Sequence, residues 1–439
     1  MQTNTKSAII LAAGDGKRMN SAKPKVLMEV AFEPMLDWVL AALRGAGIAP
    51  ENTAVIIGAR AELLQKHLSK SHGGVQTFVQ SERKGTGHAV MQAEAFLRER
   101  VGANVAGSIG GSVAVLCGDA PFMDADTIAM AYEQHRSGDY GATVITAELD
   151  NPANYGRIIR TGNGANTITH IVEEKDCTEE QRAIREINSG AYWFNCGGLL
   201  ETLPKLTTAN KSGEYYLTDT IGLLHSVSAY KAADSRIVLG ANNRRDLRGL
   251  NAIAFEESIN KHSDNGVEII GDCYIARNAV IGRDTTLLPG TVIRPDVVIG
   301  EDCKIGPFAH LRPGTRLADG VKIGDFVELK SANIGEKTSV AHLSYIGDAD
   351  VGSGVNFGCG CVTANYDGVN KYRTTIGDNA FIGCNTNLIA PVTIGENAMT
   401  AAGSTINREV PANALAIERT PLRIKENWKL NDDRANKRK

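Results

Sequence analysis

The chain of 439 residues is long enough for two or three domains, and its 43% hydrophobic and 22% charged residues are typical of a globular protein. Its formal net charge of −3 provides no broad basic field for nucleic acid or a membrane surface. No apolar run reaches the roughly 18 residues of a membrane span, no signal-peptide pattern opens the chain, and the eight cysteines include no C-x-x-C pair. We therefore expect a cytoplasmic protein without membrane insertion, nucleic-acid partner, structural zinc or disulfides.

The first 240 or so residues alternate short β-rich runs with helical patterns. We expect strands over 7–12, 53–58, 75–79, 112–117 and 142–147, and helices over 35–46, 61–70, 86–100 and 124–134. This alternation predicts a parallel α/β sheet whose ligand site lies at the carboxyl ends of the strands. A helical pattern from Asp246 to His262 is expected to connect two domains.

The first expected strand runs into a glycine-containing turn followed by basic residues. Leu11, Ala12, Ala13 and Gly14 end the strand, and Lys17, Arg18 and, after Pro24, Lys25 follow. Small residues let backbone N–H groups approach an anionic ligand, and the cations favour a phosphate. The spacing matches neither a Walker A loop nor G-x-G-x-x-G. A glycine turn alone is common, and an isolated lysine is by default a solvated surface cation.

The second half of the chain carries a hexapeptide repeat. An aliphatic residue stands at every sixth position from Ile269 to Ile323, and the fifth residue of each cycle is small. A period of six fits a parallel β-helix, with the aliphatic side chain on the axis and the small residue near a corner. The next stations, Ile334 and later Val351, each come one residue early, and the rhythm breaks between Thr363 and Thr375. We expect this break to be a loop thrown out of the coil.

Three residues of the repeat have candidate chemistry. Arg312 and Lys330 are separated by three hexads, which is one coil, so they would stack where they could clamp a phosphate. His342 is a candidate general base, because an imidazole suits proton transfer near neutral pH. Surface charges and a packed histidine are the ordinary alternatives.

Several motifs in order resemble those of sugar-1-phosphate nucleotidyltransferases. L-A-A-G-x-G-x-R-M followed by P-K resembles their fingerprint, and the further matches are Gln80 with 85–88, 116–121, 155–157, 171–173, 186–190 and 242–244. Together with the hexapeptide domain, residues 7–428 resemble the bifunctional family of N-acetylglucosamine-1-phosphate uridyltransferases/glucosamine-1-phosphate N-acetyltransferases. The resemblance implies a Rossmann-like domain (1–243), a helical linker (244–263) and a left-handed β-helix with C-terminal tail (264–439).

The resemblance also implies roles for individual residues of the first domain. Asp119 and Asn242 would hold Mg²⁺, and Arg18 and Lys25 would act as catalytic cations. The residues that would bind UTP and N-acetylglucosamine 1-phosphate, and hence the UDP-N-acetylglucosamine product, are Leu11, Ala12, Ala13, Gly14, Lys25, Gln80, Gly85, Thr86, Gly156, Glu173, Asn188 and Asn242. Asp119 alone could equally be a helix cap.

In the second domain the resemblance assigns an acetyl-CoA-dependent N-acetyltransferase site. His342 would accept a proton, and the sugar-phosphate ligands would be Arg312, Lys330, Tyr345 and Asn356. Acetyl-CoA would contact Cys359, Asn365, Tyr366, Cys384, Ala402 and Arg419. The family commonly has Ala at the position of Cys359 and Ser at that of Cys384. The segment between Arg244 and Ile269 is also shorter than the family's and lacks its Asp-Pro element.

The resemblance thus implies a bifunctional, homotrimeric enzyme that makes UDP-N-acetylglucosamine for cell-wall synthesis. It would acetylate glucosamine 1-phosphate with acetyl-CoA and then couple the product to UTP, releasing pyrophosphate. Two alternatives remain: a single-activity sugar-1-phosphate nucleotidyltransferase whose β-helix serves oligomerisation or regulation, and a β-helix scaffold that only binds partners. The Arg312, Lys330 and His342 set favours the bifunctional enzyme, since a scaffold has no need of it.

Overall fold

The computed structural model describes residues 6–14, 16–58, 61–102, 111–160 and 168–426. The basic tail, 427–439, lies outside the described residues, and so does the side chain of Lys17. Contacts divide the chain into two compact units, Met1–Ile253 and Ala254–Lys439, and the division falls within α8 (Arg244–Asp264). Within the described residues, the helices are all too short or too polar to span a membrane.

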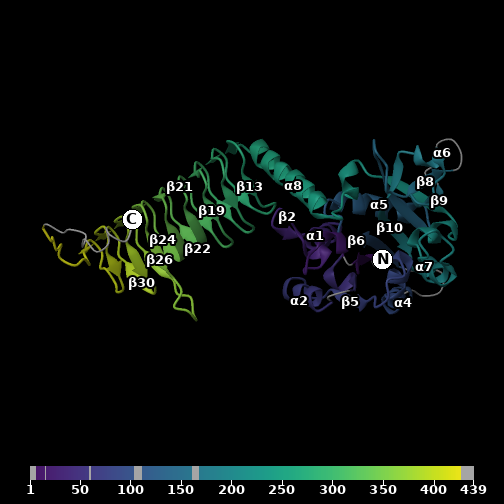
Figure 1. The fold of residues 1–439 in the computed structure, drawn as a ribbon, viewed down its shortest axis with the longest axis horizontal. Coiled ribbons are helices and arrows are strands. Elements are labelled where there is room, and N and C mark those ends of the chain that lie inside the picture. Colours follow the sequence, from purple (N-terminus) through teal and green to yellow (C-terminus); the bar gives the residue numbers. More distant parts are fainter. Residues whose placement is uncertain (1–5, 15, 59–60, 103–110, 161–167, 427–439) are drawn as a thin grey trace, which may run out of the picture. The chain divides into compact units, whose positions relative to one another are not determined.

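The first unit contains a mixed, mainly parallel sheet with the strand order β11-β7-β10-β6-β1-β4-β5 (Figure 1). Its strands are β1 (Lys6–Ala12), β4 (Thr53–Ile57), β5 (Gln76–Val79), β6 (Ser112–Cys117), β7 (Ala142–Glu148), β10 (Glu186–Asn195) and β11 (Val227–Lys231). The five strands expected from the sequence are confirmed to within a residue or two. β1, β4, β5 and β6 are parallel as expected, but β10, a strand that the sequence did not predict, runs antiparallel to β6 and β7, so the expectation of a parallel sheet is wrong there. Here the chain returns through a hairpin, β8 (Arg157–Arg160) and β9 (Ile168–Val172), and not through a crossover helix.

The sheet of the first unit has a hydrophobic core on each face. Successive residues of β1 alternate between them, with Ala8 and Ile10 in one core and Ile9 in the other. α1 packs against α5 on one face, and α4 packs against α7 on the other. The helices are α1 (Met35–Gly45), α2 (Ala61–Ser71), α3 (Thr86–Met91), α4 (Glu94–Gly102), α5 (Ala125–Ser137), α6 (Glu179–Arg182) and α7 (Cys196–Thr202). The unit also has a small hairpin, β2 (Glu29–Val30) and β3 (Glu33–Pro34), and the 3₁₀ turns η1 (Lys17–Met19), η2 (Lys25–Leu27), η3 (Pro50–Asn52), η4 (Leu203–Lys205), η5 (Leu217–Gly222) and η6 (Ser235–Val238).

The single helix expected over 86–100 is instead two helices, α3 and α4. Nε2 of Gln92 donates to the backbone oxygen of His88, while the backbone N–H of Gln92 bonds to Ala89. The Gln92 side chain therefore occupies the His88 carbonyl, which the backbone N–H of Gln92 would bond in a continuous α-helix. The backbone makes a tighter turn instead, and α4 begins after it.

The second unit is the parallel β-helix that the hexapeptide period predicts. Each coil places one short strand on each of three faces, and its axial aliphatic residues and its small corner residues are both buried, as at Leu287 and Thr285. The first face holds β12 (Glu268–Ile269), β15 (Thr286–Leu287), β18 (Lys304–Ile305), β21 (Lys322–Asp325), β23 (Ser339–His342), β25 (Asn356–Phe357), β28 (Phe381–Ile382), β31 (Met399–Thr400) and β33 (Leu415–Ala416).

The other two faces are joined through the long strands β22 (Glu328–Ile334) and β24 (Tyr345–Val351), which take part in both. The second face adds β13 (Tyr274–Ile275), β16 (Val292–Ile293), β19 (His310–Leu311), β26 (Val362–Ala364), β29 (Asn387–Ile389) and β32 (Thr405–Ile406). The third adds β14 (Val280–Ile281), β17 (Val298–Ile299), β20 (Arg316–Leu317), β27 (Thr374–Ile376) and β30 (Val392–Ile394).

Coil length changes along the β-helix as the sequence predicts. Leu311 pairs with Leu329 across a coil of three full hexads, whereas Leu329 pairs with Ile346 across a coil that is one residue shorter. Val351 then pairs with Ile376, because residues 365–373 leave the coil as a projecting loop, here called the finger (Figure 1). The finger is closed by a bridge between Tyr366 and Lys371. The expected loop is confirmed, although Thr363, Thr374 and Thr375 at its limits belong to strands.

Candidate active sites

The first candidate site lies at the carboxyl ends of β1 and β6, where parallel-sheet proteins place their ligands. The N–H of Gly118 donates to the carbonyl of Leu11 at 3.0 Å and holds the two strand ends together. Two cavities of about 280 and 540 Å³ open there, and both include Cys117 and Asp119. The smaller one is lined by Leu11, Ala12, Ala13, Gly14, Lys25, Val26, Gln80, Arg83, Gly85, Thr86, Ala89, Cys117, Asp119 and Glu214.

Lys25 joins the two expected metal ligands. Its Nζ makes an ion pair with Oδ2 of Asp119 and donates to Oδ1 of Asn242 at 3.1 Å. Asn242 is held in turn by Asp246, whose Oδ2 accepts its backbone N–H at 2.8 Å. Two oxygen ligands from distant segments of the chain thus converge on one cationic atom. This donor set fits an oxygen-seeking cation such as Mg²⁺.

The Gly85–Thr86 turn is fixed by a segment far along the chain. Gly85 has φ +108°, and a Cβ added there would lie 2.4 Å from the backbone oxygen of Tyr215. Oγ1 of Thr86 accepts the N–H of Leu217 at 3.0 Å. The buried Gln80 amide donates to the Gly85 carbonyl at 3.1 Å and also meets His88. These contacts fix the turn at the smaller cavity, which Gln80, Gly85 and Thr86 help to line.

Gly156, Glu173 and Asn188 come together from three different strands or turns. A Cβ built on Gly156 would lie 3.6 Å from both Cβ of Asn188 and Oε2 of Glu173, so the three residues are close neighbours, and the backbone N–H of Asn188 donates to the Gly156 carbonyl at 2.9 Å. Burial raises the pKa of Glu173, against the opposing hydrogen bond from Thr218 at 3.0 Å. The arrangement offers hydrogen-bonding groups suited to a sugar.

The structure differs from the sequence expectation in some details of this site. Arg18 is exposed in η1 and does not line either cavity among the described residues. Sequence reasoning missed Arg83 and Glu214, which line the smaller cavity, and Tyr215, which supports Gly85. No local motif marks Glu214 or Tyr215, because they reach the site from a segment much farther along the chain.

In the second unit, His342 has a carboxylate partner that the sequence analysis missed. Nδ1 of His342 lies 2.7 Å from Oδ1 of Asp325, its register neighbour on the preceding coil. The hydrogen bond to His342 lowers the pKa of Asp325. The pair leaves Nε2 of the imidazole as the nitrogen available to a substrate. Coil spacing was the available signal, since Asp325 precedes His342 by one shortened coil.

The expected acetyl-CoA contacts form a ladder along one corner of the β-helix, coil after coil. The carbonyl of His342 accepts from Gly360, that of Cys359 from Asn385, and that of Cys384 from Gly403. Register therefore stacks His342, Cys359 and Cys384 on successive coils, and Ala402 follows. Arg419 completes the ladder, with its Cδ 4.0 Å from a Cβ built on Gly403. Cys384 is exposed and Cys359 half-buried.

Arg312 and Lys330 stand on neighbouring coils, as predicted, but each already has an acidic neighbour. Nη1 of Arg312 lies 2.7 Å from Oε1 of Glu328, and Nζ of Lys330 lies 3.9 Å from Oδ2 of Asp348. The ammonium of Lys371, on the finger, and then burial, lower the pKa of Lys330. Two adjacent ammonium groups and a guanidinium would suit the expected phosphate, so Arg312, Lys330 and Lys371 are here called the anion-binding corner.

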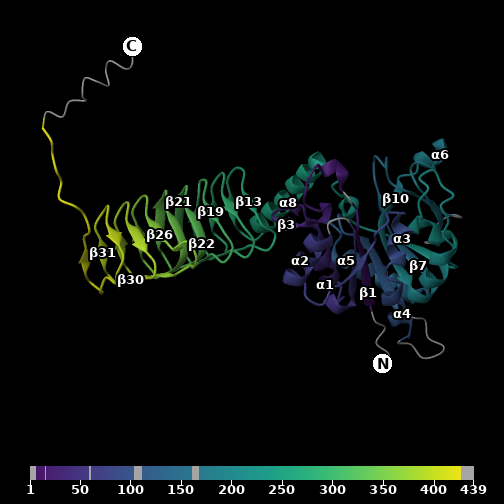
Figure 2. The ribbon, with the colours of Figure 1, turned by 60° about the horizontal axis from the view of Figure 1, so that its bottom comes forward.

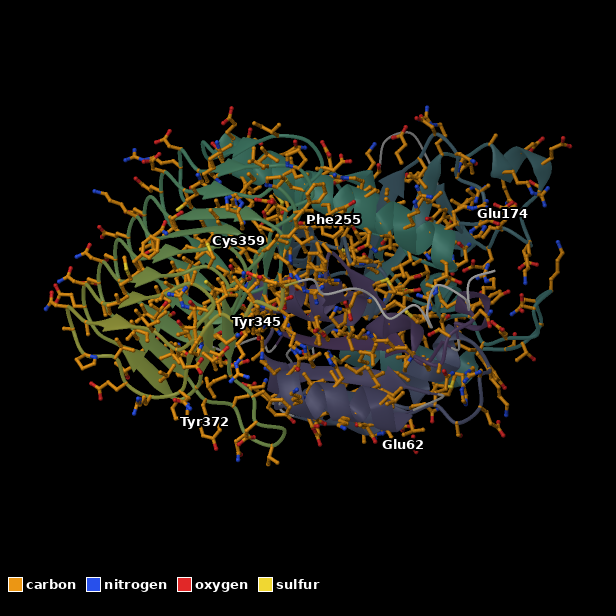
Figure 3. All side chains as sticks on the ribbon, turned by 60° about the vertical axis from the view of Figure 1, so that its left-hand side comes forward. Glu62, Glu174, Phe255, Tyr345, Cys359 and Tyr372 are labelled. Atoms are coloured by element: carbon orange, nitrogen blue, oxygen red, sulfur yellow. The ribbon has the colours of Figure 1, made fainter. Side chains whose placement is uncertain are left out.

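His342 and the anion-binding corner occupy different parts of the same coils. His342 ends a strand of the first face, whereas Lys330 pairs with Gly347, farther along the next strand. The Tyr345 hydroxyl lies over Gly347, so its ring extends along the strand toward the residue that pairs with Lys330. Asn356 is exposed on the first face. Of these regions, Figure 3 labels Tyr345, Cys359 and, on the finger, Tyr372.

The finger carries Asn365 and Tyr366, two of the expected acetyl-CoA contacts, and the first of them lies beside the anion-binding corner. Asn365 donates from Nδ2 to Oδ2 of Asp348. Arg373 makes a two-pronged ion pair with Asp350, at 2.6 and 2.8 Å, which anchors the base of the finger to the third face. Tyr366 is 59% exposed, so its ring is free to contact another molecule.

Comparisons with known proteins agree with both sites. A nucleotidyl transferase family model matches residues 7–235, and a bacterial transferase hexapeptide model of six repeats matches 296–331 and 373–408. The chain is 42% identical to the bifunctional protein GlmU of Acetivibrio thermocellus over 96% of each chain. It is 42% identical to that of Clostridium acetobutylicum, over 96% of this chain and 98% of the relative, and 43% identical to that of a Geobacillus species, over 96% and 97%.

These matches confirm the resemblance and decide between the alternatives. Both halves of the chain belong to transferase families, and the relatives that match nearly the whole chain are bifunctional. The chain is therefore an enzyme with a uridyltransferase half and an acetyltransferase half, and it belongs to the GlmU family of bifunctional proteins.

Proposed function

We propose that the chain carries out its two transfers at two separate sets of residues, one in each unit. In the first unit, the phosphate of N-acetylglucosamine 1-phosphate attacks the α-phosphorus of UTP and pyrophosphate leaves. Phosphoryl-type transfer is catalysed by positioning and charge neutralisation. Lys25 and Arg18 would neutralise the triphosphate, and the backbone of 11–14 would approach it closely.

The convergence of Lys25, Asp119 and Asn242 is the observation that carries this half of the proposal. Asp119 and Asn242 would hold Mg²⁺, with Lys25 turning from them to the substrate phosphates. When bound, the ion would neutralise charge on the phosphate oxygens. Gln80, Gly85 and Thr86 would read the uracil edge.

The sugar would lie where Gly156, Glu173 and Asn188 meet. Hydrogen bonds to its hydroxyls and acetamido group would orient the phosphate for in-line attack. The close approach of Gly156, Asn188 and Glu173 supports this placement.

In the second unit, the amine of glucosamine 1-phosphate attacks the thioester carbonyl of acetyl-CoA. Nε2 of His342 would accept the amine proton, and the CoA sulfur leaves and takes up a proton as the new amide forms. Asp325 would orient the imidazole and stabilise its protonated form. Arg312 and Lys330 would bind the phosphate, and Tyr345 and Asn356 the sugar. The ladder of Cys359, Cys384, Ala402 and Arg419, together with Asn365 and Tyr366, would contact acetyl-CoA.

We further propose that the enzyme is a cytoplasmic homotrimer. The exposed Tyr366 on a projecting finger supports a site completed by a neighbouring copy, and closed cyclic assembly would bury the flat faces of the β-helix. Acetyl transfer would then need the trimer, and uridyl transfer would not. Sedimentation analysis combined with both assays tests this: a fully active monomer would contradict it.

A crossed pair of substitutions tests the separation of the two sites. Asp119→Ala should abolish uridyl transfer and spare acetyl transfer. His342→Ala should lower acetyl transfer by about 10²–10⁴-fold, the effect of one positioned base, and spare uridyl transfer. In each variant, the activity of the site that is not substituted reports whether the protein has folded. Equal loss of both activities in either variant would refute the assignment.

A further inference from the structure

A cluster of two histidines and one aspartate lies outside both candidate active sites. Asp37 is in the first turn of α1, His67 is in α2, and His72 follows the end of α2; the two helices lie side by side (Figures 1 and 2). Oδ1 of Asp37 is 2.6 Å from Nε2 of His67 and 3.0 Å from Nε2 of His72. All three side chains are sheltered, with exposures of 19%, 22% and 8% respectively.

The three atoms have the spacing and chemistry of metal ligands. They all lie within 4.8 Å of one another. A tetrahedral ion with bonds of about 2.0–2.2 Å holds its donor atoms about 3.3–3.6 Å apart, so small side-chain shifts would admit it. Two imidazoles and a carboxylate suit Zn²⁺ and related transition ions, whereas Mg²⁺ prefers oxygen ligands.

We propose that Asp37, His67 and His72 bind a divalent transition-metal ion of the zinc class, which links α1 to α2. Water would occupy the remaining ligand position. The site is separate from the proposed Mg²⁺ site, which uses Asp119 and Asn242.

Arg44 gives the proposal a sharper test. Its Nη1 lies 3.2 Å from Nδ1 of His72, and a guanidinium can only donate, so Nδ1 accepts and Nε2 carries the proton. An ion needs the lone pair of Nε2. Binding therefore requires the imidazole to change tautomer and the exposed Arg44 to turn away. Removing Arg44 should also remove the repulsion between its charge and the ion.

The experiment is Zn²⁺ titration of the full-length, metal-free protein with Mg²⁺ in excess, followed by calorimetry, and Co²⁺ titration followed by the visible spectrum of the bound ion. We expect one site that is weakened about 100-fold in Asp37→Asn, His67→Asn and His72→Asn. Arg44→Gln should bind about tenfold more tightly. His170→Asn, at an exposed histidine on β9 of the same unit, is the matched control and should bind as wild type does.

Stability provides a second measurement in case a variant folds poorly. At free Zn²⁺ about 100-fold above the wild-type dissociation constant, the unfolding equilibrium constant of the wild type should fall about 100-fold, and that of the three ligand variants only about twofold. Unfolding of each variant without metal reports its folding separately. Equal Zn²⁺ affinity in wild type and ligand variants would overturn the proposal, since it would place the ion at exposed thiols or other histidines. Absence of binding would overturn it too, leaving the cluster as a hydrogen-bond network.

Discussion

Replacing Asp325 with asparagine tests whether this residue works through His342. The substitution keeps the size of the side chain and one carbonyl oxygen but removes the charge that faces Nδ1 of His342 at 2.7 Å. The amide can rotate to present a donor, which would favour the tautomer in which Nε2 is protonated and cannot accept a proton. The expected loss is therefore in kcat for acetyl transfer, with the KM values of both substrates unchanged.

The magnitude follows from the exposure of the pair. Asp325 and His342 side chains are 39% and 59% exposed, so water screens their charge interaction and competes for the hydrogen bond. The effect should be well below the roughly 10⁴-fold of a buried aspartate in a serine-protease triad. We expect kcat to fall about 10–100-fold, the range of residues that orient another catalytic group.

Three measurements separate positioning from general damage. Asp325→Glu should recover part of the loss, because it restores a carboxylate. In the His342→Ala background, Asp325→Asn should have almost no further effect, because its partner is gone. Asp302→Asn, at an exposed aspartate of an earlier coil whose positive φ asparagine also tolerates, should be neutral. Additive losses in the double variant would refute the reasoning.

Gly85→Ala should raise the KM for UTP at least about tenfold in steady-state kinetics, because the new Cβ would lie 2.4 Å from the backbone oxygen of Tyr215. Gly73→Ala, at a glycine without a positive φ where no neighbouring atom lies within 4 Å, should show no such change, and a normal KM in Gly85→Ala would contradict the nucleotide role of this turn. Burial lowers the pKa of His135 to about 4, below its unfolded value of about 6.5, so its protonation favours unfolding as pH falls between these values. Denaturant unfolding should show that the free energy of unfolding falls by up to about 3 kcal/mol over this pH range in the wild type and not in His135→Gln. The same dependence on pH in both proteins would contradict this role of His135. A fragment of residues 1–253 should keep uridyl transfer, whereas a fragment of residues 1–243 should lose most of it. The shorter fragment lacks Asp246, which positions Asn242, and other residues that line the larger cavity. Equal uridyl-transfer activity in the two fragments would be inconsistent with this role of Asp246.

The β-helix could be read from the sequence because its determinants repeat. Each axial residue, such as Ile293 or Ile305, meets the same environment one coil away, so the period reports burial directly. Even the early stations at Ile334 and Val351 were correctly indicated, since a residue removed at a corner shifts every later station. In the first unit, the strands that are followed by helices could also be predicted from the sequence. The direction of β10 could not, because it depends on the hairpin that precedes this strand and not on the residues of β10.

The candidate sites were less predictable where partners come from distant segments. Motifs identified Lys25 and Asn242, but no sequence pattern shows that their side chains meet at 3.1 Å. Lys371 was missed because the finger lies outside the repeat, although its ammonium lies beside that of Lys330. The separation of His342 from the anion-binding corner follows from which face each strand joins, and a linear period does not show this.

If the ladder along the β-helix corner binds acetyl-CoA as proposed, it also acts as a molecular ruler. Four steps lead from His342 to Arg419, through Cys359, Cys384 and Ala402, and neighbouring strands are about 4.8 Å apart, so the two ends are separated by about 19 Å. In the proposed binding mode, the number of coils would measure an extended acyl donor with its thioester at one end and a charged nucleotide at the other. Deleting one whole coil within this stretch would keep the period of the axial residues and yet shorten the ruler by one step. The number of coils would therefore set the length of cofactor that fits, independently of how the interior is packed.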